Sequence, residues 1–125
     1  MLLDMDGLKD INDRYGHLTG SRALCRLGES LRVNCRDIDT AARYGGDEFA
    51  IVLPEAGPSE AQEVAWRIRE RVAQDTEEPP ISVSIGTAVF PHDGKTRVAL
   101  LSAADRALYG MKDSFREEQR PRVGP

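Results

Sequence analysis

The chain has 125 residues, which suffices for one domain and leaves no room for a second hydrophobic core. Hydrophobic residues at 40% and charged residues at 30% exclude a disordered chain, and no apolar run reaches the roughly 18 residues of a membrane span. The net charge of −4 argues against a protein that coats DNA or RNA, so local cations or metal ions must attract any phosphate ligand.

The start of the chain and its two cysteines carry little functional information. Residues 1–4 show no signal-peptide pattern and begin within an apolar run, as though the front of a domain preceded them. Cys25 and Cys35 fall in one predicted helix about 15 Å apart, which is beyond disulfide reach. We therefore expect two reduced, partly buried thiols in a cytoplasmic chain.

The first third of the chain predicts a strand followed by two helices. Apolar residues at 1–5 indicate the end of a buried strand, and a short helix follows that closes near Gly16. A longer helix is expected from about Thr19 to Cys35. Its apolar residues recur at helical spacing on one face: Leu24, Leu27, Leu31 and Cys35.

Two short strands are expected next, at about 40–44 and 48–53. Gly45 and Gly46 lie between them, and a Gly-Gly pair in this position predicts a tight hairpin in which glycine adopts positive φ.

The rest of the chain predicts a helix, a strand and a final helix. Ser59 and Gln62 have the spacing of a capping box, which opens a helix that ends near residue 74. Alternating apolar residues over 81–89 indicate a strand with one buried face, and helical periodicity continues from about 97 to 115.

The order β-α-α-β-β-α-β-α predicts an α+β fold with α/β-type layers. We expect a central, mostly antiparallel sheet with a ferredoxin-like βαββαβ core, flanked by helices. Residues 1–116 form this domain, and the polar residues 117–125 are expected to be a flexible tail.

The first acidic motif is Asp4-Met5-Asp6-Gly7, at the exit of the first strand. A strand end, a glycine turn and a helix N-terminus together favour a phosphate ligand, and carboxylates favour Mg²⁺. An acidic helix cap explains the motif equally well. Leu8 does not fit an EF-hand loop, and a phosphohydrolase with an aspartyl nucleophile fits better but lacks its Thr.

The second acidic motif lies at the predicted hairpin tip, where Asp47 and Glu48 follow the two glycines. Glycine lets a bulky anionic ligand approach the backbone closely, but two carboxylates repel that ligand unless a metal lies between them. In an arbitrary hairpin, solvated acidic side chains are the simpler explanation.

The run Gly45-Gly46-Asp47-Glu48-Phe49 between two strands resembles the signature of the GGDEF domain, the diguanylate cyclase family. Further segments resemble that family's motifs in the same order. These are Asp4 to Asp13 with Gly16-His17 and Gly20, then Ser84-Ile85-Gly86, and then Ala104 to Lys112. The resemblance covers nearly all of residues 1–116.

The resemblance implies that each domain binds one nucleoside triphosphate, GTP or ATP, together with Mg²⁺ or Mn²⁺. Two domains would meet as a homodimer, and each 3′-hydroxyl would attack the α-phosphate held by the partner. Two pyrophosphates would leave, and a cyclic dinucleotide second messenger would form.

The resemblance also implies roles for individual residues. The metal ligands would be Asp4, the Met5 carbonyl, Asp47 and Glu48, and the catalytic residues would be Asp47, as base, and Glu48. The substrate-binding residues would be Gly7, Leu8, Lys9, Asn12, His17, Ser21, Gly45, Gly46, Lys112 and Arg116.

Arg36 and Asp39 have the RxxD form of the family's product-inhibition site, and Arg67 matches a second arginine used there. A guanidinium and an accepting carboxylate suit the donors and acceptors of a guanine edge. A charge cluster at a helix end is the simpler explanation of RxxD alone, although its offset from the GGDEF motif favours function. This site supports an alternative function, a catalytically weak receptor for cyclic di-GMP.

Ser21 departs from the family, which normally has an Asp there that reads guanine together with Asn12. A carboxylate only accepts hydrogen bonds, whereas a hydroxyl also donates, so Ser21 loses the discrimination against adenine. The sequence resembles a promiscuous subgroup of the family that has Ser at this position, and this resemblance implies use of ATP beside GTP and formation of cyclic GMP–AMP. Decay of the site is the alternative. Leu8 stands where Phe is usual, and Phe115 replaces a Gly before Arg116. The family's leading helical segment is absent, and an upstream sensory or regulatory domain is expected.

Overall fold

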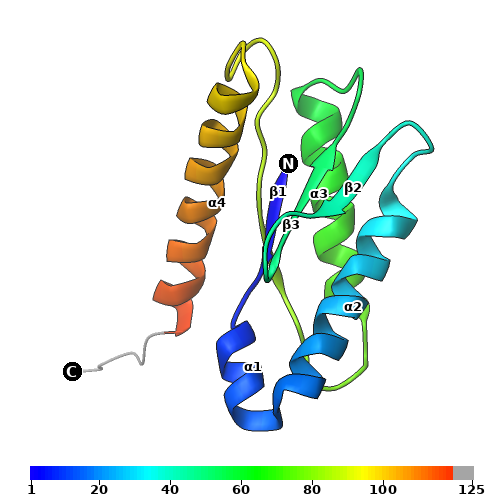
Figure 1. Cartoon of the computed structure of the whole chain (residues 1–125), viewed down its shortest axis with the longest axis vertical. Helices are drawn as coiled ribbons and strands as arrows, with labels where there is room; N and C mark the ends of the chain where they lie inside the picture. The colour runs from blue at the N-terminus through cyan, green and yellow to red at the C-terminus, as the bar shows by residue number, and fades with distance from the viewer. Residues whose placement is uncertain (120–125) are drawn as a thin grey trace.

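In the computed structural model, which describes residues 1–119, a four-stranded antiparallel sheet carries helices on both faces (Figure 1). The elements are β1 (Leu2–Met5), α1 (Leu8–Tyr15), α2 (His17–Asn34), β2 (Thr40–Arg43), β3 (Glu48–Val52), α3 (Pro58–Gln74), β4 (Val83–Gly86) and α4 (Arg97–Gln119). The strand order β2-β3-β1-β4 confirms the predicted α+β fold, with a ferredoxin-like βαββαβ core to which α1 and α4 are added.

Strand β1 lies in the interior of the sheet, and its side chains alternate between the two faces. Leu3 and Met5 are buried in the main core, which α2 and α3 cover. Leu2 points to the opposite face and packs with Ala104 and Leu108 of α4. The even-numbered residues of β1 therefore face α4, and this places Asp4 beneath the same helix.

Gly86 allows α4 to lie directly on the sheet. A Cβ atom at this position would lie 2.1 Å from the Ala104 carbonyl oxygen and 2.4 Å from the Leu108 nitrogen. Both are backbone atoms, so a side chain could be accommodated only by moving the helix. The close approach explains the glycine that follows Ser84 and Ile85 in β4.

The helix α2 is tied to the loop before β4 by a buried arginine that sequence patterns did not indicate. Arg26 has a side chain that is 5% exposed, and it donates to the carbonyl oxygens of Pro79 and Glu77 at 2.7 Å each. Its Nε also lies 2.9 Å from an Asp75 carboxylate oxygen. These bonds fix the path of the chain into β4.

Two expected features near the start of α3 and in β4 are corrected. Gly57, not Ser59, is the N-cap of α3, and its N–H donates to the Glu60 carboxylate at 3.1 Å. Pro58 suits the first helical position, so the helix begins earlier than the Ser59–Gln62 capping box predicts. Strand β4 covers only Val83–Gly86 of the strand expected over 81–89.

The C-terminal helix and one cysteine differ from the expectations. Helix α4 continues through residues 117–119, which were expected to be part of the flexible tail; the remainder of that tail, 120–125, lies outside the described residues. Cys25 is exposed rather than partly buried, because it lies on the outer side of α2. No helix within residues 1–119 combines the length and the apolar character that crossing a membrane requires.

Candidate functional site

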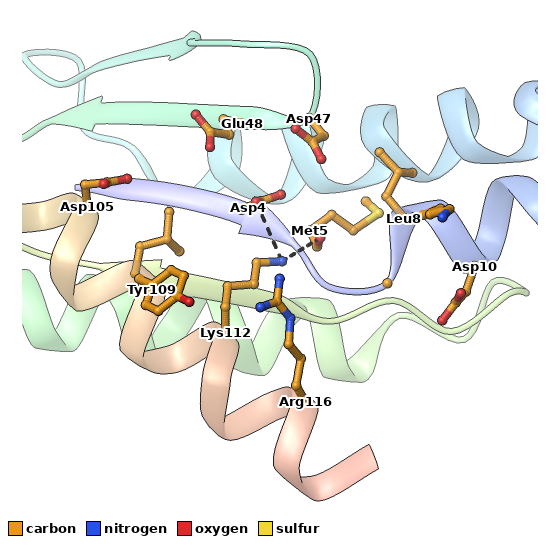
Figure 2. Close-up of a pocket in the computed structure, with 13 residues that line it drawn as sticks. Asp4, Met5, Leu8, Asp10, Asp47, Glu48, Asp105, Tyr109, Lys112 and Arg116 are labelled. Carbon is orange, nitrogen blue, oxygen red and sulfur yellow. Dashed lines mark hydrogen bonds and ion pairs between the residues drawn. The ribbon is translucent and has the colours of Figure 1, made fainter. Parts of the chain in front are cut away.

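A cavity of about 790 Å³ lies where β1 leaves the sheet, between the start of α1, the start of β3 and the last turns of α4 (Figure 2). It brings together nine residues that the sequence predicted: Asp4, Met5, Gly7, Leu8, Lys9, Asp47, Glu48, Lys112 and Arg116. It is also lined by four that the sequence did not assign to a site: Asp10, Asp105, Leu108 and Tyr109.

Two carboxylates face each other across neighbouring strands in this cavity. Asp4 of β1 is paired directly with Glu48 of β3, and Asp47 precedes Glu48 in the hairpin. Like charges in this arrangement destabilise a sheet unless a cation lies close by. The pKa of Asp4 is raised to about 6, mainly by burial, and further by the charges of Asp47, Glu48 and Asp6, while Lys112 acts in the opposite direction.

One oxygen of Asp4 has no hydrogen-bond partner. Its Oδ1 is buried and unpartnered, whereas its Oδ2 lies 3.7 Å from the Lys112 ammonium. A buried carboxylate oxygen normally has a partner, so an unpaired one in a cavity indicates a place for a ligand.

Lys112 brings a positive charge to the end of β1 from α4. Its Nζ donates to the Met5 carbonyl at 2.8 Å and lies 3.1 Å from Asp6 Oδ1, and the contacts to Met5 and Asp4 are drawn in Figure 2. Arg116 follows one helical turn later, remains 66% exposed, and lies 3.8 Å from Asp113. The two cations therefore differ: Lys112 is held among acidic groups, whereas Arg116 is exposed at the rim of the cavity.

The glycines of the hairpin have a different role from the one expected. Neither Gly45 nor Gly46 has a positive φ, so the predicted turn geometry is wrong. The N–H groups of Tyr44 and Gly45 both donate to the Glu48 carbonyl, which forms a wider loop. A Cβ at Gly46 would meet no atom within 4 Å, so packing within the chain does not explain the absence of a side chain.

Gly7 turns the chain directly from β1 into α1. It has φ of 67°, a left-handed conformation that other residues adopt only with strain, and it serves as the N-cap of α1. The first turn of α1 consequently lines the cavity. The N–H groups of a first helical turn lack partners within the helix and favour an anion such as phosphate.

The residues present fit a divalent cation that is shared with a substrate. Within residues 1–119, no three His, Cys, Asp or Glu side chains lie close enough to hold a metal by themselves. Mg²⁺, however, commonly uses one or two carboxylates and completes its octahedron with water and substrate phosphates. The unpartnered Asp4 oxygen opposite Glu48 provides such a partial set of hard oxygen donors. Coordination by Asp4, Met5, Asp47 and Glu48 stays a prediction.

Three of the predicted substrate-binding residues lie outside the cavity, on the α1–α2 hairpin. Asn12 packs against Gly20, where a Cβ would lie 1.7 Å from Asn12 Oδ1. Asn12 thus lies beside the start of α2, which carries the exposed residues His17 and Ser21. Gly45 and Gly46 also fall outside the cavity lining.

The predicted product-inhibition residues are only partly brought together. Arg36 and Asp39 line a second cavity of about 510 Å³. Arg36 Nη2 donates to Asp39 Oδ1 at 2.8 Å and to the Pro54 carbonyl at 2.8 Å, and this hydrogen bonding lowers the pKa of Asp39. Arg67 is exposed on α3 and does not line this cavity.

The helical periodicity of α4 could have indicated two further cavity residues, Asp105 and Tyr109, which the sequence analysis did not assign to a site. Asp105 and Tyr109 fall on the helix face that also carries Lys112, because they precede it by two turns and one turn. Asp105 is exposed and lines the cavity. Asp10 gave no such signal, because it follows a turn whose direction Gly7 determines.

Comparison with known proteins identifies a family. The profile described as "Diguanylate cyclase, GGDEF domain" matches residues 1–118. The bifunctional diguanylate cyclase/cyclic di-GMP phosphodiesterase MucR of Pseudomonas aeruginosa is 41% identical over 120 residues, which cover 93% of this chain and 18% of MucR. The chain spans between 15% and 33% of the length of the curated relatives it matches.

Solved structures agree with the profile. The GGDEF domain of YfiN (TpbB) from Pseudomonas aeruginosa has a TM-score of 0.84 and 35% identity, over 90% of this chain and 74% of that one. The GGDEF domain of DgcB from Caulobacter crescentus, solved in complex with c-di-GMP, has a TM-score of 0.82 and 31% identity, over 90% and 70% of the two chains.

Proposed function

Because the chain belongs to the GGDEF family of diguanylate cyclases, we propose that it condenses two nucleoside triphosphates into a cyclic dinucleotide and releases two pyrophosphates. The observation that carries this proposal is the pair of opposed carboxylates, Asp4 and Glu48, in a cavity that the first turn of α1 and Lys112 also line. The Asp4 Oδ1 is buried there without a hydrogen-bond partner. Carboxylates that hold a metal, beside cations that bind phosphate, are what nucleotidyl transfer requires.

The residues of the cavity would have different roles, according to their positions. Asp4, Asp47, Glu48 and the Met5 carbonyl would hold Mg²⁺ or Mn²⁺, which when bound would supply positive charge to offset the negative charge that develops on the phosphate. Asp47, at the hairpin tip, would accept the proton of the attacking 3′-hydroxyl. The open space around Gly46 supports a close approach of the nucleotide to the hairpin.

The cationic side of the cavity would bind the triphosphate. Lys112 and Arg116 point from α4 toward the end of β1 (Figure 2), and the first turn of α1 adds backbone N–H groups. The purine base of the nucleotide would extend toward the α1–α2 hairpin. Asn12 and Ser21 lie there, outside the cavity that would hold the phosphates.

Two copies of the chain would act together. The cyclic product contains two nucleotides, and each chain would bind one of them at its acidic cavity. We therefore propose a homodimer in which each cavity presents its 3′-hydroxyl to the α-phosphate bound by the partner.

Ser21 bears on the choice of base. It is exposed beside the Asn12–Gly20 contact, and its hydroxyl both donates and accepts hydrogen bonds, so it would accommodate adenine as well as guanine. We propose GTP as substrate with ATP as a second one, which gives cyclic GMP–AMP beside cyclic di-GMP.

A receptor function is the second candidate, and the Arg36–Asp39 pair favours it. The pair lines a cavity separate from the acidic one, and its groups suit a guanine edge. In such a receptor, cyclic di-GMP would bind without turnover.

One set of incubations separates these candidates. The protein is mixed with GTP, ATP or both, with Mg²⁺, and the products are separated by chromatography. We expect cyclic di-GMP from GTP, mixed product from both nucleotides, and no turnover by Asp47→Ala. Ser21→Asp should direct product toward cyclic di-GMP, and an unchanged product ratio would contradict the role of Ser21.

Absence of any cyclic product, at concentrations where the protein is dimeric, would exclude the cyclase. Calorimetric titration with cyclic di-GMP would then test the receptor, with Arg36→Ala expected to abolish binding. Glu63→Gln, an exposed charge change on α3, is the control for both experiments.

A further inference from the structure

The two aspartates of the Asp-Met-Asp motif have different environments. Asp4 lines the cavity, and its Oδ1 is buried without a hydrogen-bond partner. Asp6 is buried, with a side chain that is 5% exposed, and both of its oxygens are engaged. Its Oδ2 accepts a hydrogen bond from Ser82 Oγ at 2.8 Å, and its Oδ1 accepts one from Ser84 Oγ at 2.6 Å. Asp6 therefore cannot turn toward a ligand without losing these bonds.

The register of β1 and β4 produces this arrangement. Asp4 is paired with Ser84, and the Asp6 N–H donates to the Ser82 carbonyl at 2.9 Å, which continues the pairing by one step. Since alternate residues share a face, both serine hydroxyls lie on the side of the sheet that carries α4. Lys112 reaches this side because it follows Leu108, which packs there, by one helical turn.

Asp6 is the closest carboxylate partner of Lys112. The Lys112 ammonium lies 3.1 Å from Asp6 and 3.7 Å from Asp4, and it donates to the Met5 carbonyl at 2.8 Å. A lysine side chain has four flexible bonds and three N–H donors, so its charge has a defined position only when fixed groups hold it. The Met5 carbonyl accepts a hydrogen bond from the ammonium, and Asp6 holds it as an ion pair, while the same side chain lines the cavity.

We propose that Asp6 is a positioning residue: held rigid by Ser82 and Ser84, it fixes the Lys112 ammonium at the cavity, where that ammonium binds a phosphate group of the substrate. The phosphate role of Lys112 rests on the proposed function, but the placement of Lys112 by Asp6 does not. Asp6 therefore has a different role from the carboxylates that are proposed to bind the metal, although Asp6 lies only two residues from Asp4.

The placement of Lys112 is tested without any nucleotide. The chain contains three lysines, Lys9, Lys95 and Lys112, so limited acetylation followed by mass spectrometry reports on each one. In Asp6→Asn we expect the reactivity of Lys112 relative to Lys95 to rise about tenfold, because the buried ion pair with Asp6 is lost. Glu63→Gln should leave the ratio unchanged. Equal protection of Lys112 in Asp6→Asn and in the unaltered chain would overturn the proposal.

A milder pair of variants covers the case in which Asp6→Asn does not fold. Ser82→Ala removes one of the hydroxyls that hold Asp6, and Ser82→Thr keeps it. Ser82→Ala should raise the reactivity of Lys112 and Ser82→Thr should restore its protection. A rise in both variants, or in neither, would contradict the role of the hydroxyl in holding Asp6.

Binding of a non-hydrolysable GTP analogue then tests whether Asp6 acts through Lys112. We expect Asp6→Asn to weaken binding about tenfold in the unaltered chain and to have little effect in a Lys112→Met background. Equal losses in both backgrounds would show a merely structural role and overturn the proposal. If the unaltered chain binds no nucleotide, the proposed function fails, and the acetylation ratios still decide the role of Asp6.

Discussion

The ionised carboxylate of Asp4 is in an unfavourable environment in the folded chain. Its side chain is 19% exposed, one oxygen is unpartnered, and three other carboxylates lie near enough to raise its pKa. Lys112 offsets only part of this effect. In the absence of a metal, the ionised Asp4 therefore destabilises the fold.

This predicts a pH dependence of stability that Asp4→Asn removes. The pKa of Asp4 is about 6 in the folded chain against an ordinary 3.8, so the folded chain binds a proton more tightly and the free energy of unfolding falls as pH rises through this window. Above pH 6, in EDTA, we expect Asp4→Asn to be more stable than the unaltered chain by about 1–3 kcal/mol. Below the ordinary pKa the difference should vanish. Urea unfolding at several pH values measures it, and parallel curves for both proteins would contradict the prediction.

At the scale of elements, the contact of α4 with β4 decides where the cations of the site lie. Leu108 packs on the sheet beside Gly86, and Lys112 and Arg116 follow at successive turns. The helix can approach so closely only because Gly86 has no side chain. The position of the cations is consequently set by a glycine in another element.

Gly86→Ala should therefore affect both stability and the site. Its Cβ would collide with backbone atoms, so we expect a loss of about 1–3 kcal/mol in the free energy of unfolding. The displaced α4 should also raise the reactivity of Lys112 toward acetylation. Gly110→Ala is the control, because its Cβ would meet no atom within 4 Å, and it should stabilise α4 by about 0.5–1 kcal/mol. Equal stability of the two variants would contradict this account.

The sequence predicted the order of all eight elements, because helical and strand periodicity are local properties. It also predicted nine residues of the cavity lining through their resemblance to family motifs. It did not reveal the Asp6–Ser82–Ser84 cluster or the buried Arg26, because each depends on pairing between segments far apart in the chain. The prediction of positive φ for Gly45 and Gly46 was wrong, because the length of the loop, and not its composition, determines the turn.

At the scale of the whole molecule, the two faces of the sheet are covered unequally. Helices α2 and α3 cover the main core, whereas α4 alone covers the other face (Figure 1). Beside α4 lies a largely apolar cavity of about 630 Å³, and Val52, Phe90 and Val98 are exposed. Association through this apolar surface must be distinguished from the pairing of two acidic cavities.

The proposed pairing predicts that turnover depends on protein concentration. Below the dissociation constant of the dimer, the rate of product formation per chain should fall in proportion to concentration, because a single chain holds half of the reactants. A dilution series with saturating GTP and Mg²⁺ measures this. Val98→Ser, which alters only the apolar surface, should follow the same curve. A constant rate per chain over a hundredfold dilution would contradict catalysis by two copies.

The central position of β1 also affects the order in which the contacts of the fold can form during synthesis. Its partners β3 and β4 begin at Glu48 and Val83, so during synthesis the first strand stays unpaired until these distant segments emerge. Contacts between such remote segments slow folding, because the intervening chain must first be closed into loops. Lys112 reaches Met5 only after nearly the entire domain has been made. Nucleotide binding should therefore arise in the last stage of folding, and a nascent chain released before α4 should fail to bind substrate.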